Sequence, residues 1–417
     1  MADRLIYLDN NATTKVDEKV LEEMLPYFSE NYANPGGMYD FAGKVGRKIA
    51  DAREAVKEFM GANDQKEIYF TGSGSEGANT AIRGVVNQGY GKKHIITTKV
   101  EHPCVLNTYK DLEKQGHKVT YLGVDADGNL NMKELEEAIR PETALVSLMA
   151  ANNETGIIFP YEKVAELVKQ KNPETKVFVD AVQAAGKIKM DFKNTKVDFA
   201  SISGHKFHAP KGIGALYVKA GTAFAPLITG GHQERGKRAG TENTASIIAI
   251  GKAAELAYDS LGEELTRVKK LRDKLERNIL HNIFNARLNS STGNRVPNTT
   301  NIGFEYIEGE LILLYLNELG ICASSGSACT SGSLDPSHVL RAMGVPFTAL
   351  HGSIRLSLSR FTTEEEIDFA CEKFPVPKGT CGTRINQKPP KLIQKIKQKP
   401  SVEGFFSTIE IKLKNFL

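Results

Sequence analysis

A lysine lies in "SGHKFHAPKG" (203–212), directly after an apolar run. A lysine in this position can be a surface charge, a phosphate ligand, or an amine that bonds covalently to a carbonyl compound. Two other features point to chemistry at the same place: "TGSGSEG" (71–77) follows a second apolar run and opens a helical pattern, and Asp180 ends a third. Small residues with exposed N–H groups at a helix N-terminus favour phosphate binding.

Asp180 and Lys206, taken singly, have ordinary structural explanations. Asp180 could cap a helix beginning at Ala181, and Lys206 could be a surface lysine with its stem packed on apolar groups. Beside a phosphate site, the two residues fit one ligand better than two unrelated roles. That ligand is pyridoxal 5'-phosphate (PLP), whose protein partners are a Schiff-base lysine and an acid on the pyridinium nitrogen.

The elements that must position these residues are short apolar runs alternating with amphipathic stretches. The runs are "EIYF" (67–70), "HIITT" (94–98), "ALVSLMA" (144–150), "KVFV" (176–179), "DFASIS" (198–203) and "GALYV" (214–218). They lack the polar alternation of a half-exposed sheet, so they indicate buried strands. Their alternation with helical patterns predicts an α/β fold with a doubly wound, mostly parallel sheet.

In open parallel sheets, ligands bind beyond the carboxyl ends of the strands. The polar residues that follow the runs are Gly74, Ser75, Glu101, His102, Asn152, Asn153, Asp180, Gln183, Ser203, His205 and Lys206. We expect them to meet at one edge of the sheet. His102 could cap a helix or stack on a flat cofactor, and the surrounding set favours stacking.

"GSGSEG" (72–77) also satisfies the GxGxxG pattern of dinucleotide-binding proteins. The acid expected about 20 residues further on would be Glu101, which precedes His102 and a proline instead of ending a plain strand. The pattern therefore supports a phosphate site more strongly than a dinucleotide site.

The second half of the chain contains a cysteine in an unusual setting. Cys329 lies in "SSGSACTSGS" (324–333), which is too rich in serine and glycine for a packed strand and predicts a mobile loop with an accessible thiol. Cys104, Cys322 and Cys371 lie in apolar-periodic contexts and are interpreted as packing residues. Arg355 interrupts an apolar strand pattern, so it needs an anion, either a ligand carboxylate or an internal salt bridge.

Bulk composition sets further limits. The chain has 417 residues, 41% of them hydrophobic, and a net charge of +4 with both signs interspersed, which argues against nucleic acid as a partner. The five cysteines lack metal-ligand spacing, and neither a signal core nor a membrane-length apolar run is present, so a cytoplasmic protein without a membrane span or intrinsic metal is expected. From Pro375 the composition becomes rich in proline and lysine, and the basic segment 375–417 is interpreted as a solvated tail.

The motifs together resemble the NifS/IscS cysteine desulfurases, within the fold-type I, class-V aminotransferase-like PLP enzymes, and are most similar to the NifS branch. The matching stretches are "YLDNNATT" (7–14), "EHP" (101–103), "ANNETG" (151–156), "VDAVQAAGK" (179–187), "SGHKFHAPKGIGALYV" (203–218), "GGHQERGKRAGTEN" (230–243), "SSGSACTSGSLDPSHVLRAMG" (324–344) and "SIRLSLSRFTTEEEID" (353–368). The resemblance implies a large PLP-binding domain over 15–260 and a small α+β domain formed by 1–14 and 261–374.

The resemblance also implies a role for each matching residue. Lys206 would form the Schiff base, Asp180 would bind the pyridinium nitrogen, and His102 would stack on the ring and assist proton transfer. The remaining implied contacts are Gln183 and Asn153 to the phenolic oxygen; Gly74, Ser75, Ser203, His205 and, from the other subunit of a homodimer, Thr241 to the phosphate; and Asn34 and Arg355 to the substrate carboxylate.

Cys329 would then be the nucleophile. Its thiolate would attack the sulfur of PLP-bound L-cysteine, leaving L-alanine and a Cys329 persulfide. The persulfide would supply an iron–sulfur scaffold protein of the NifU or IscU type, with nitrogenase cluster assembly as one destination and Cys329 as a transient cluster ligand.

Four departures from the family pattern accompany the resemblance, and one of them is "APKG" (209–212) in place of the usual GPKG. "NPGGMYDF" (34–41) replaces the usual NPSSxH, so Tyr39 stands where a histidine is expected; "TGSGSE" (71–76) replaces TSxxTE; and the basic tail begins where the last helix should continue. The alternatives that stay open are a selenocysteine lyase or another fold-type I PLP enzyme, a dinucleotide-dependent oxidoreductase, and a non-catalytic sulfur carrier.

Overall fold

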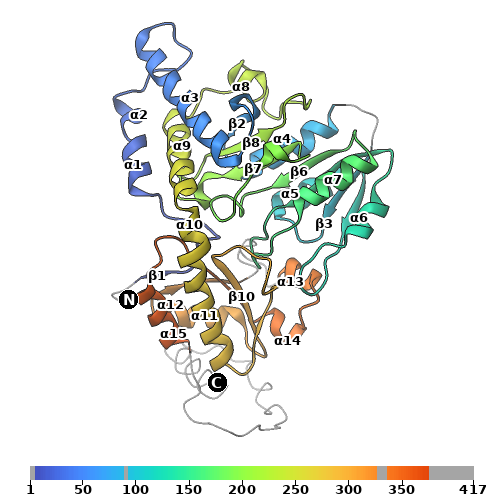
Figure 1. Ribbon diagram of the computed structural model, residues 1–417, viewed down its shortest axis with the longest axis vertical. Coiled ribbons are helices and arrows are strands. Elements are labelled where there is room, and N and C mark those ends of the chain that lie inside the picture. The colour runs from blue at the N-terminus through green and yellow to red at the C-terminus, as the bar shows by residue number, and fades with distance from the viewer. Residues whose placement is uncertain (1–4, 89–92, 326–335, 375–417) are drawn as a thin grey trace, which may run out of the picture.

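The computed structural model describes residues 5–88, 93–325 and 336–374 (Figure 1). The predictions for Cys329 and for the tail 375–417 therefore lie outside the described residues. Within those ranges the chain forms two sheets of four or more strands, each with its own helices and its own apolar core.

The larger sheet has seven strands in the order β2-β8-β7-β6-β5-β3-β4. Their bounds are β2 Ile68–Thr71, β3 His94–Thr98, β4 Lys118–Leu122, β5 Thr143–Met149, β6 Lys176–Asp180, β7 Phe199–Ser203 and β8 Gly214–Val218. All neighbours are parallel except β8, which is antiparallel to β2 and β7. The prediction of a mostly parallel sheet built on the six apolar runs is confirmed.

Side chains alternate between the two faces of this sheet, and each face has its own layer of helices. Phe178 and Phe199 pack with α4 (Gly74–Val86) and α5 (Pro103–Lys114) on one side. Val179 and Ile202 pack on the other side with α3 (Asp40–Met60), α7 (Tyr161–Lys171) and α9 (Thr244–Asp259). The sheet is therefore doubly wound, as the fully apolar strands predict.

The smaller part is built around a four-stranded sheet of order β12-β13-β10-β9. Its strands are β9 Ala286–Leu288, β10 Thr299–Phe304, β12 Ser324–Ser325 and β13 Ser353–Ser357, and its helices are α11 Lys269–Asn282, α12 Gly309–Glu318, α13 His338–Ala342, α14 Phe347–Leu350 and α15 Glu364–Lys373. Thr363 and Glu366 form a reciprocal capping box at the start of α15.

The N-terminus belongs to this smaller part. β1 (Ile6–Tyr7) pairs in parallel with β11 (Ile321–Cys322), and Asp9 bridges to Ser357 at the end of β13.

The remaining elements are α1 Glu18–Met24, α2 Pro26–Ser29, the 3-10 turns Gln65–Glu67, Phe192–Asn194 and Gly204–Lys206, α6 Met132–Ala138, α8 Gln233–Gly236, α10 Leu261–Glu263 and a π turn at Glu264–Val268. The division of the strands agrees with two domains, whose boundaries stay a prediction.

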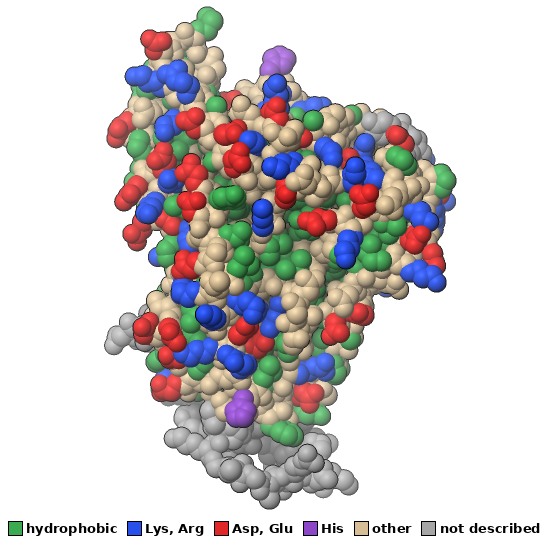
Figure 2. Space-filling model, viewed as in Figure 1, with side chains coloured by type: hydrophobic (Ala, Val, Ile, Leu, Met, Phe, Trp, Pro, Cys, Tyr) green, Lys and Arg blue, Asp and Glu red, His purple; other side chains and the backbone are tan. Residues whose placement is uncertain are grey.

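Acidic and basic side chains are interspersed over the face shown in Figure 2, and no single-sign field gathers there. In the described part of the chain, no helix is both long and apolar enough to cross a membrane.

Candidate active site

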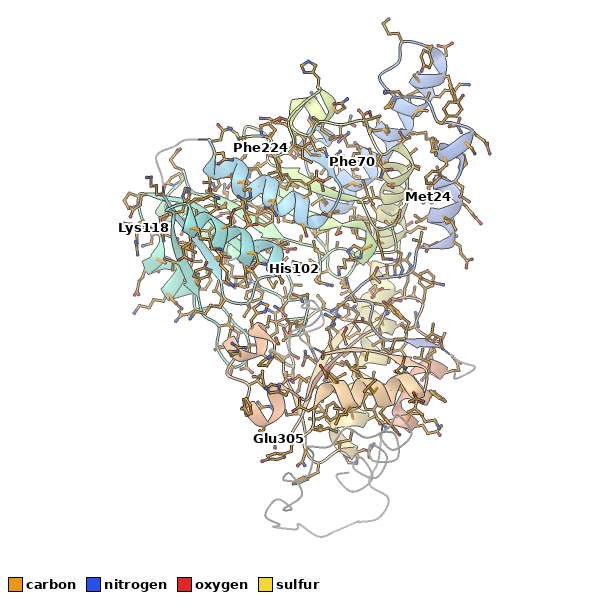
Figure 3. All side chains as sticks on the ribbon, turned by 180° about the vertical axis from the view of Figure 1, so that it is seen from behind. Met24, Phe70, His102, Lys118, Phe224 and Glu305 are labelled. Atoms are coloured by element: carbon orange, nitrogen blue, oxygen red, sulfur yellow. The ribbon has the colours of Figure 1, made fainter. Side chains whose placement is uncertain are left out.

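One cavity lies at the carboxyl ends of β5, β6 and β7, with about 210 Å³ open to the centre of a water molecule. Its lining residues are Asn11, Ser73, Gly74, Ser75, His102, Cys104, Met149, Ala151, Asn153, Asp180, Val182, Gln183, Ser203, His205, Lys206 and Arg355. His102 marks its position in Figure 3, where the larger part of the molecule meets the smaller. The cavity lies at the edge of the sheet that the sequence predicts.

The first turn of α4 forms one wall. Ser73 is the N-cap, and its Oγ accepts a hydrogen bond from Glu76 N at 3.1 Å. Gly74 allows close approach, because a Cβ at this position would lie 2.6 Å from Val182 Cγ2 and 3.3 Å from Ser203 Cβ. The helix N-terminus therefore presents backbone N–H groups to the cavity, as an anion site requires.

Asp180 ends β6 and is buried, with 6% of its surface exposed. Its Oδ1 accepts a hydrogen bond from Val182 N at 3.0 Å. Burial raises the pKa of Asp180, and His102, the Val182 N–H and Lys206 oppose that rise. A carboxylate in this setting is stabilised by a cation that reaches it.

His102 is the N-cap of α5, and its Nδ1 accepts a hydrogen bond from Cys104 N at 3.2 Å. Burial lowers the pKa of His102 below its usual value, so the ring is neutral at pH 7. Of the two alternatives considered from the sequence, helix capping is found for this residue; His102 also lines the cavity, and its stacking on a cofactor stays a prediction.

Lys206 lies at the end of the 3-10 turn after β7. Its Nζ donates hydrogen bonds to Asn11 O and Ala12 O, both at 2.7 Å. The N-terminal segment thus fixes the amine at the cavity wall. Next to it, the His205 Nδ1 shares a hydrogen bond with Thr13 Oγ1 at 3.1 Å, and burial lowers the pKa of His205 to about 4.

Arg355 enters the cavity from β13 and is 3% exposed. Its Nη2 pairs with Asp9 Oδ1 at 2.7 Å and its Nη1 donates to Asn153 O at 3.0 Å, which confirms the internal salt bridge as one of the two alternatives. Among the described residues, the buried Arg355 Nε and Gln183 Oε1 have no hydrogen-bond partner. Both residues line the cavity and can bind a polar ligand.

Glu101 is completely buried behind His102. Its Oε1 accepts hydrogen bonds from Thr98 Oγ1 at 2.6 Å and Met149 N at 3.1 Å. Burial raises the pKa of Glu101 to about 8, opposed by the Thr98 hydrogen bond and supported by the charge of Asp180. Glu101 is therefore mostly protonated at pH 7.

This protonation leads to a stability prediction for Glu101→Gln. The folded protein holds the Glu101 proton more tightly than the unfolded chain, so this stabilisation is full below about pH 4.5 and is lost as the pH rises towards 8. Glutamine does not titrate. We expect the free energy of unfolding of the variant, relative to the native protein, to rise by at least about 1 kcal/mol between pH 5 and pH 8.

Denaturant unfolding at both pH values measures this change. Glu142→Gln, at an exposed glutamate, is the matched control and should show no such pH dependence. Equal pH dependence in Glu101→Gln and the native protein would contradict a protonated Glu101.

The structure brings most of the predicted site residues together. Those that line the cavity are Gly74, Ser75, His102, Asn153, Asp180, Gln183, Ser203, His205, Lys206 and Arg355. Asn34 is exposed, accepts a hydrogen bond from Gly36 N at 3.0 Å and does not line the cavity.

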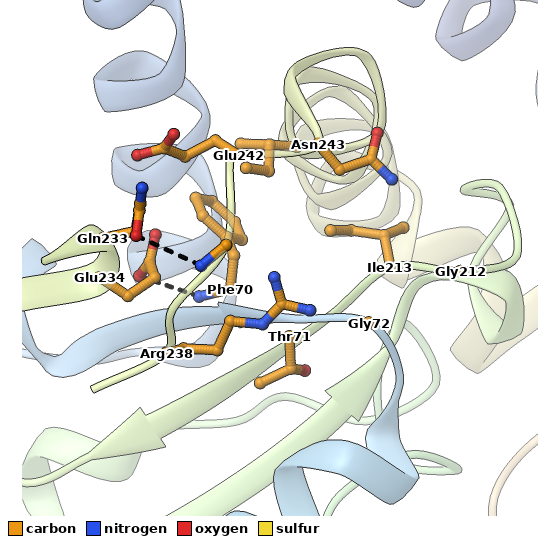
Figure 4. Close-up of a pocket in the computed structure, with 12 residues that line it drawn as sticks. Phe70, Thr71, Gly72, Gly212, Ile213, Gln233, Glu234, Arg238, Glu242 and Asn243 are labelled. Carbon is orange, nitrogen blue, oxygen red and sulfur yellow. Dashed lines mark hydrogen bonds between the residues drawn. The ribbon is translucent and has the colours of Figure 1, made fainter. Parts of the chain in front are cut away.

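Thr241 is also exposed and outside this cavity. It follows Gly240 in a loop that lines a separate, smaller cavity (Figure 4), where Gln233 Oε1 accepts a hydrogen bond from Gly240 N and Glu234 Oε2 accepts one from Phe70 N.

Sequence reasoning missed six residues that line the main cavity, of which Met149, Ala151 and Val182 are apolar and Asn11, Ser73 and Cys104 carry an amide, a hydroxyl and a thiol. Asn11 lies within the matching stretch "YLDNNATT" and Ser73 within the predicted phosphate site "TGSGSEG" (71–77), and these were the signals available for them. The sequence favours a packing role for Cys104. Its side chain does pack beside the core under α5, but it also lines the cavity and is hydrogen-bonded to the Ser75 side chain. Burial raises the pKa of the Cys104 thiol, so this side chain stays protonated at pH 7. The reactive form of a cysteine is the thiolate, which Cys104 does not form here.

In the described ranges, no group of three or more histidine, cysteine, aspartate or glutamate side chains is arranged to hold a metal ion. The cavity therefore presents an anion-binding helix terminus, a buried acid, a fixed amine and a buried guanidinium. This set can hold a phosphorylated, carbonyl-bearing cofactor and an amino acid.

Comparison with known proteins gives one consistent result. The family model for class-V aminotransferases matches residues 6–369. A cysteine desulfurase of Trichormus azollae is 55% identical over 372 residues, covering 89% of this chain and 92% of the relative. Cysteine desulfurase NifS of Azotobacter vinelandii is 50% identical over 375 residues, covering 90% and 92%.

The solved structure of a NifS-like protein superimposes with a TM-score of 0.84 at 40% identity and covers 89% of this chain and 98% of its own. Residues 6–369, which the family model matches, include both sheets and every residue that lines the cavity. The chain therefore belongs to the class-V aminotransferase family and, within it, to the cysteine desulfurases.

Proposed function

We propose that this protein uses PLP to remove sulfur from L-cysteine, releases L-alanine, and passes the sulfur through Cys329 to an iron–sulfur assembly partner. The observation that carries the proposal is the joint presence of Lys206, Asp180 and the α4 N-terminus in one cavity of a cysteine desulfurase fold. Cys329 enters on sequence grounds, because it lies outside the described residues.

The cavity residues fit PLP in charge and shape. Asp180 is a buried acid suited to a protonated ring nitrogen, and Gln183 Oε1 is a buried acceptor without a partner in the described part of the chain. Gly74 lets the start of α4 pack closely against Val182 and Ser203, and Ser75 and Ser203 supply hydroxyl groups for a phosphate at this helix terminus. When bound, PLP supplies an electron-withdrawing ring that labilises bonds at the Cα of an amino acid.

The protein's own residues bind, orient and move protons around that ring. The Lys206 amine is the covalent attachment point and afterwards the base that takes the Cα proton of the substrate. The neutral His102 offers a flat face for stacking, and the neutral His205 offers the phosphate an N–H hydrogen bond without a positive charge. Asn153 lines the same cavity as Gln183 and is assigned to a hydrogen bond with the phenolic oxygen of PLP.

Substrate binding involves the guanidinium of Arg355. Its Nε has no hydrogen-bond partner among the described residues, while Asp9 and Asn153 hold the two terminal nitrogens. We propose that this fixed side chain binds the carboxylate of L-cysteine. Asn34 stays a predicted substrate ligand that requires the loop 34–39 to approach the cavity.

Thr241 is exposed and does not line the active-site cavity of its own chain, which supports its assignment to the phosphate of a second subunit in a homodimer. For the sulfur acceptor we propose an iron–sulfur scaffold protein of the NifU or IscU type, with Cys329 as a transient cluster ligand. A cytoplasmic location stays a prediction from the sequence.

Product analysis with purified, PLP-loaded protein tests the function. We expect alanine and sulfide in equimolar amounts from L-cysteine with a thiol reductant present. Release of neither alanine nor sulfide from L-cysteine would point to a non-catalytic sulfur carrier, and alanine from selenocysteine but not from cysteine would point to a selenocysteine lyase. Either result would overturn the proposal.

A further inference from the structure

A second cavity shares Lys206 with the active-site cavity and is otherwise lined by different residues. Its lining residues are Asn10, Thr14, Ala185, Gly186, Lys187, Lys206, Phe207, His208, Ala257, Glu264, Asn298, Leu358, Ser359 and Arg360. About 20 Å³ is open to the centre of a water molecule, and one water needs about 10–15 Å³ measured in this way. Lys206 is therefore a wall shared by two cavities.

Lys187 reaches this second cavity from the loop after β6. Gly186 turns the chain with φ +73, and a Cβ there would lie 3.2 Å from Phe207 Cβ, so the turn lies against the segment that carries Lys206. The Lys187 side chain is buried, and its Nζ donates to Lys206 O at 3.4 Å. An ammonium carries three donors, so this single long hydrogen bond leaves donors for another acceptor.

Glu264 enters the same cavity from the π turn between α9 and α11. Its Oε1 accepts a hydrogen bond from Arg360 N at 3.1 Å. Its Oε2 is buried and has no hydrogen-bond partner within the described ranges. Lys187 and Glu264 have opposite charges and share the cavity, but they form no direct ion pair within 4.0 Å in this part of the chain.

We propose that a buried water molecule bridges Lys187 and Glu264 beside Lys206, and that this bridged pair positions the catalytic lysine. The inference rests on the proposed covalent role of Lys206. The water accepts a hydrogen bond from Lys187 Nζ and donates one to Glu264 Oε2, so both buried charges gain a partner. A metal cation does not fit the site, because the Lys187 ammonium already supplies the positive charge.

Other charged groups nearby are compatible with this arrangement. Arg360 is paired with Asp17 at 2.7 Å, and burial lowers the pKa of His208 to about 3, so His208 is neutral. Burial lowers the pKa of Lys187 to about 8, with the charge of Glu264 opposing and that of Lys206 supporting the shift. Burial also raises the pKa of Glu264 to about 7, opposed by Lys187 and Arg360.

Lys187→Met tests the inference in the PLP-loaded protein, with Lys189→Met, at an exposed lysine two residues away, as the matched control. Lys187→Met removes a positive charge near Lys206. A basic nitrogen at Lys206 then holds its proton more tightly, so its pKa rises. We expect the pH midpoint of the absorption band of bound PLP to rise by about half a pH unit or more. We expect kcat to fall about 10-fold and KM for L-cysteine to change less than twofold, since the substrate binds in the other cavity.

If Lys187→Met does not fold, Glu264→Gln tests the same bridged pair. Its control is Glu263→Gln, at the exposed neighbouring glutamate. We expect a lower kcat with KM unchanged. A band midpoint and kcat equal to those of the control, in whichever variant folds, would overturn the inference. The proposed function fails in a different way: the native protein would then show no PLP band, or Lys206→Ala would leave the band and its pH midpoint unchanged.

Discussion

Replacement of Lys206 by alanine is expected to lower kcat for alanine formation by more than about 10³-fold. Lys206 is the amine that the structure holds at the cavity wall through Asn11 O and Ala12 O, both at 2.7 Å. Without it, the covalent attachment point and the base for the Cα proton are both lost. The visible absorption band of the native protein should also disappear or shift in the variant.

Lys211→Ala is the matched control, because Lys211 belongs to the same loop but is exposed. Lys206→Ala also leaves the two carbonyls without their donor, so its unfolding midpoint should be measured alongside the rate. Lys206→Arg retains hydrogen-bond donors while removing the nucleophilic amine. A folded Lys206→Arg protein with native kcat would contradict the covalent role of Lys206.

Replacement of Cys329 by alanine is the second large effect that we expect, a loss of more than about 10³-fold in sulfide release from L-cysteine. The described residues on both sides of the segment 326–335 are anchored beside the active site. Ser324 Oγ donates to Asp9 Oδ2 at 3.0 Å, and Asp9 in turn pairs with Arg355. On the other side, the His338 Nε2 is hydrogen-bonded to Glu101 O at 2.9 Å.

The visible band of bound PLP should be unchanged in Cys329→Ala, because the cofactor ligands are intact. Cys322→Ala serves as the control, since Cys322 is half-buried on β11 and lies outside the cavity. Mass spectrometry should detect an added sulfur atom on Cys329 in the native protein after reaction with L-cysteine. Full sulfide release by Cys329→Ala would instead favour another PLP activity of this fold.

Much of the larger sheet could be predicted from the sequence because its central strands are buried on both faces. Runs such as "KVFV" and "GALYV" are apolar throughout and correspond to β6 and β8. β4 was not predicted, because Lys118–Leu122 is an edge strand whose residues, apart from Leu122, are exposed or half-buried, so its pattern "KVTYL" resembles no continuous apolar run. The antiparallel direction of β8 depends on the long-range pairing with β2, which has no local signal.

The candidate site could be predicted where a side chain follows a strand, since the carboxyl ends of parallel strands meet at one edge. Asp180 and His102 were found in this way. The contacts that hold Lys206 could not be found, because Asn11 O and Ala12 O are main-chain atoms about two hundred positions away, and any residue has such a carbonyl. The same holds for the Lys187–Glu264 cavity, which depends on the packing of a loop against a π turn.

The position of β1 also determines when during synthesis the active site can form. Ile6 N and Leu8 N are hydrogen-bonded to Gly320 O and Cys322 O, and Asp9 bridges to Ser357. These partners leave the ribosome some 350 residues after the N-terminus, which corresponds to roughly 20–70 s at the usual rates of translation. Until then β1 has no strand to pair with, and the segment after β1, which carries Asn11 O and Ala12 O, is not held in place beside Lys206. The nascent chain can therefore fold its larger sheet early, but it completes its catalytic centre only after β11 and β13 have been synthesised.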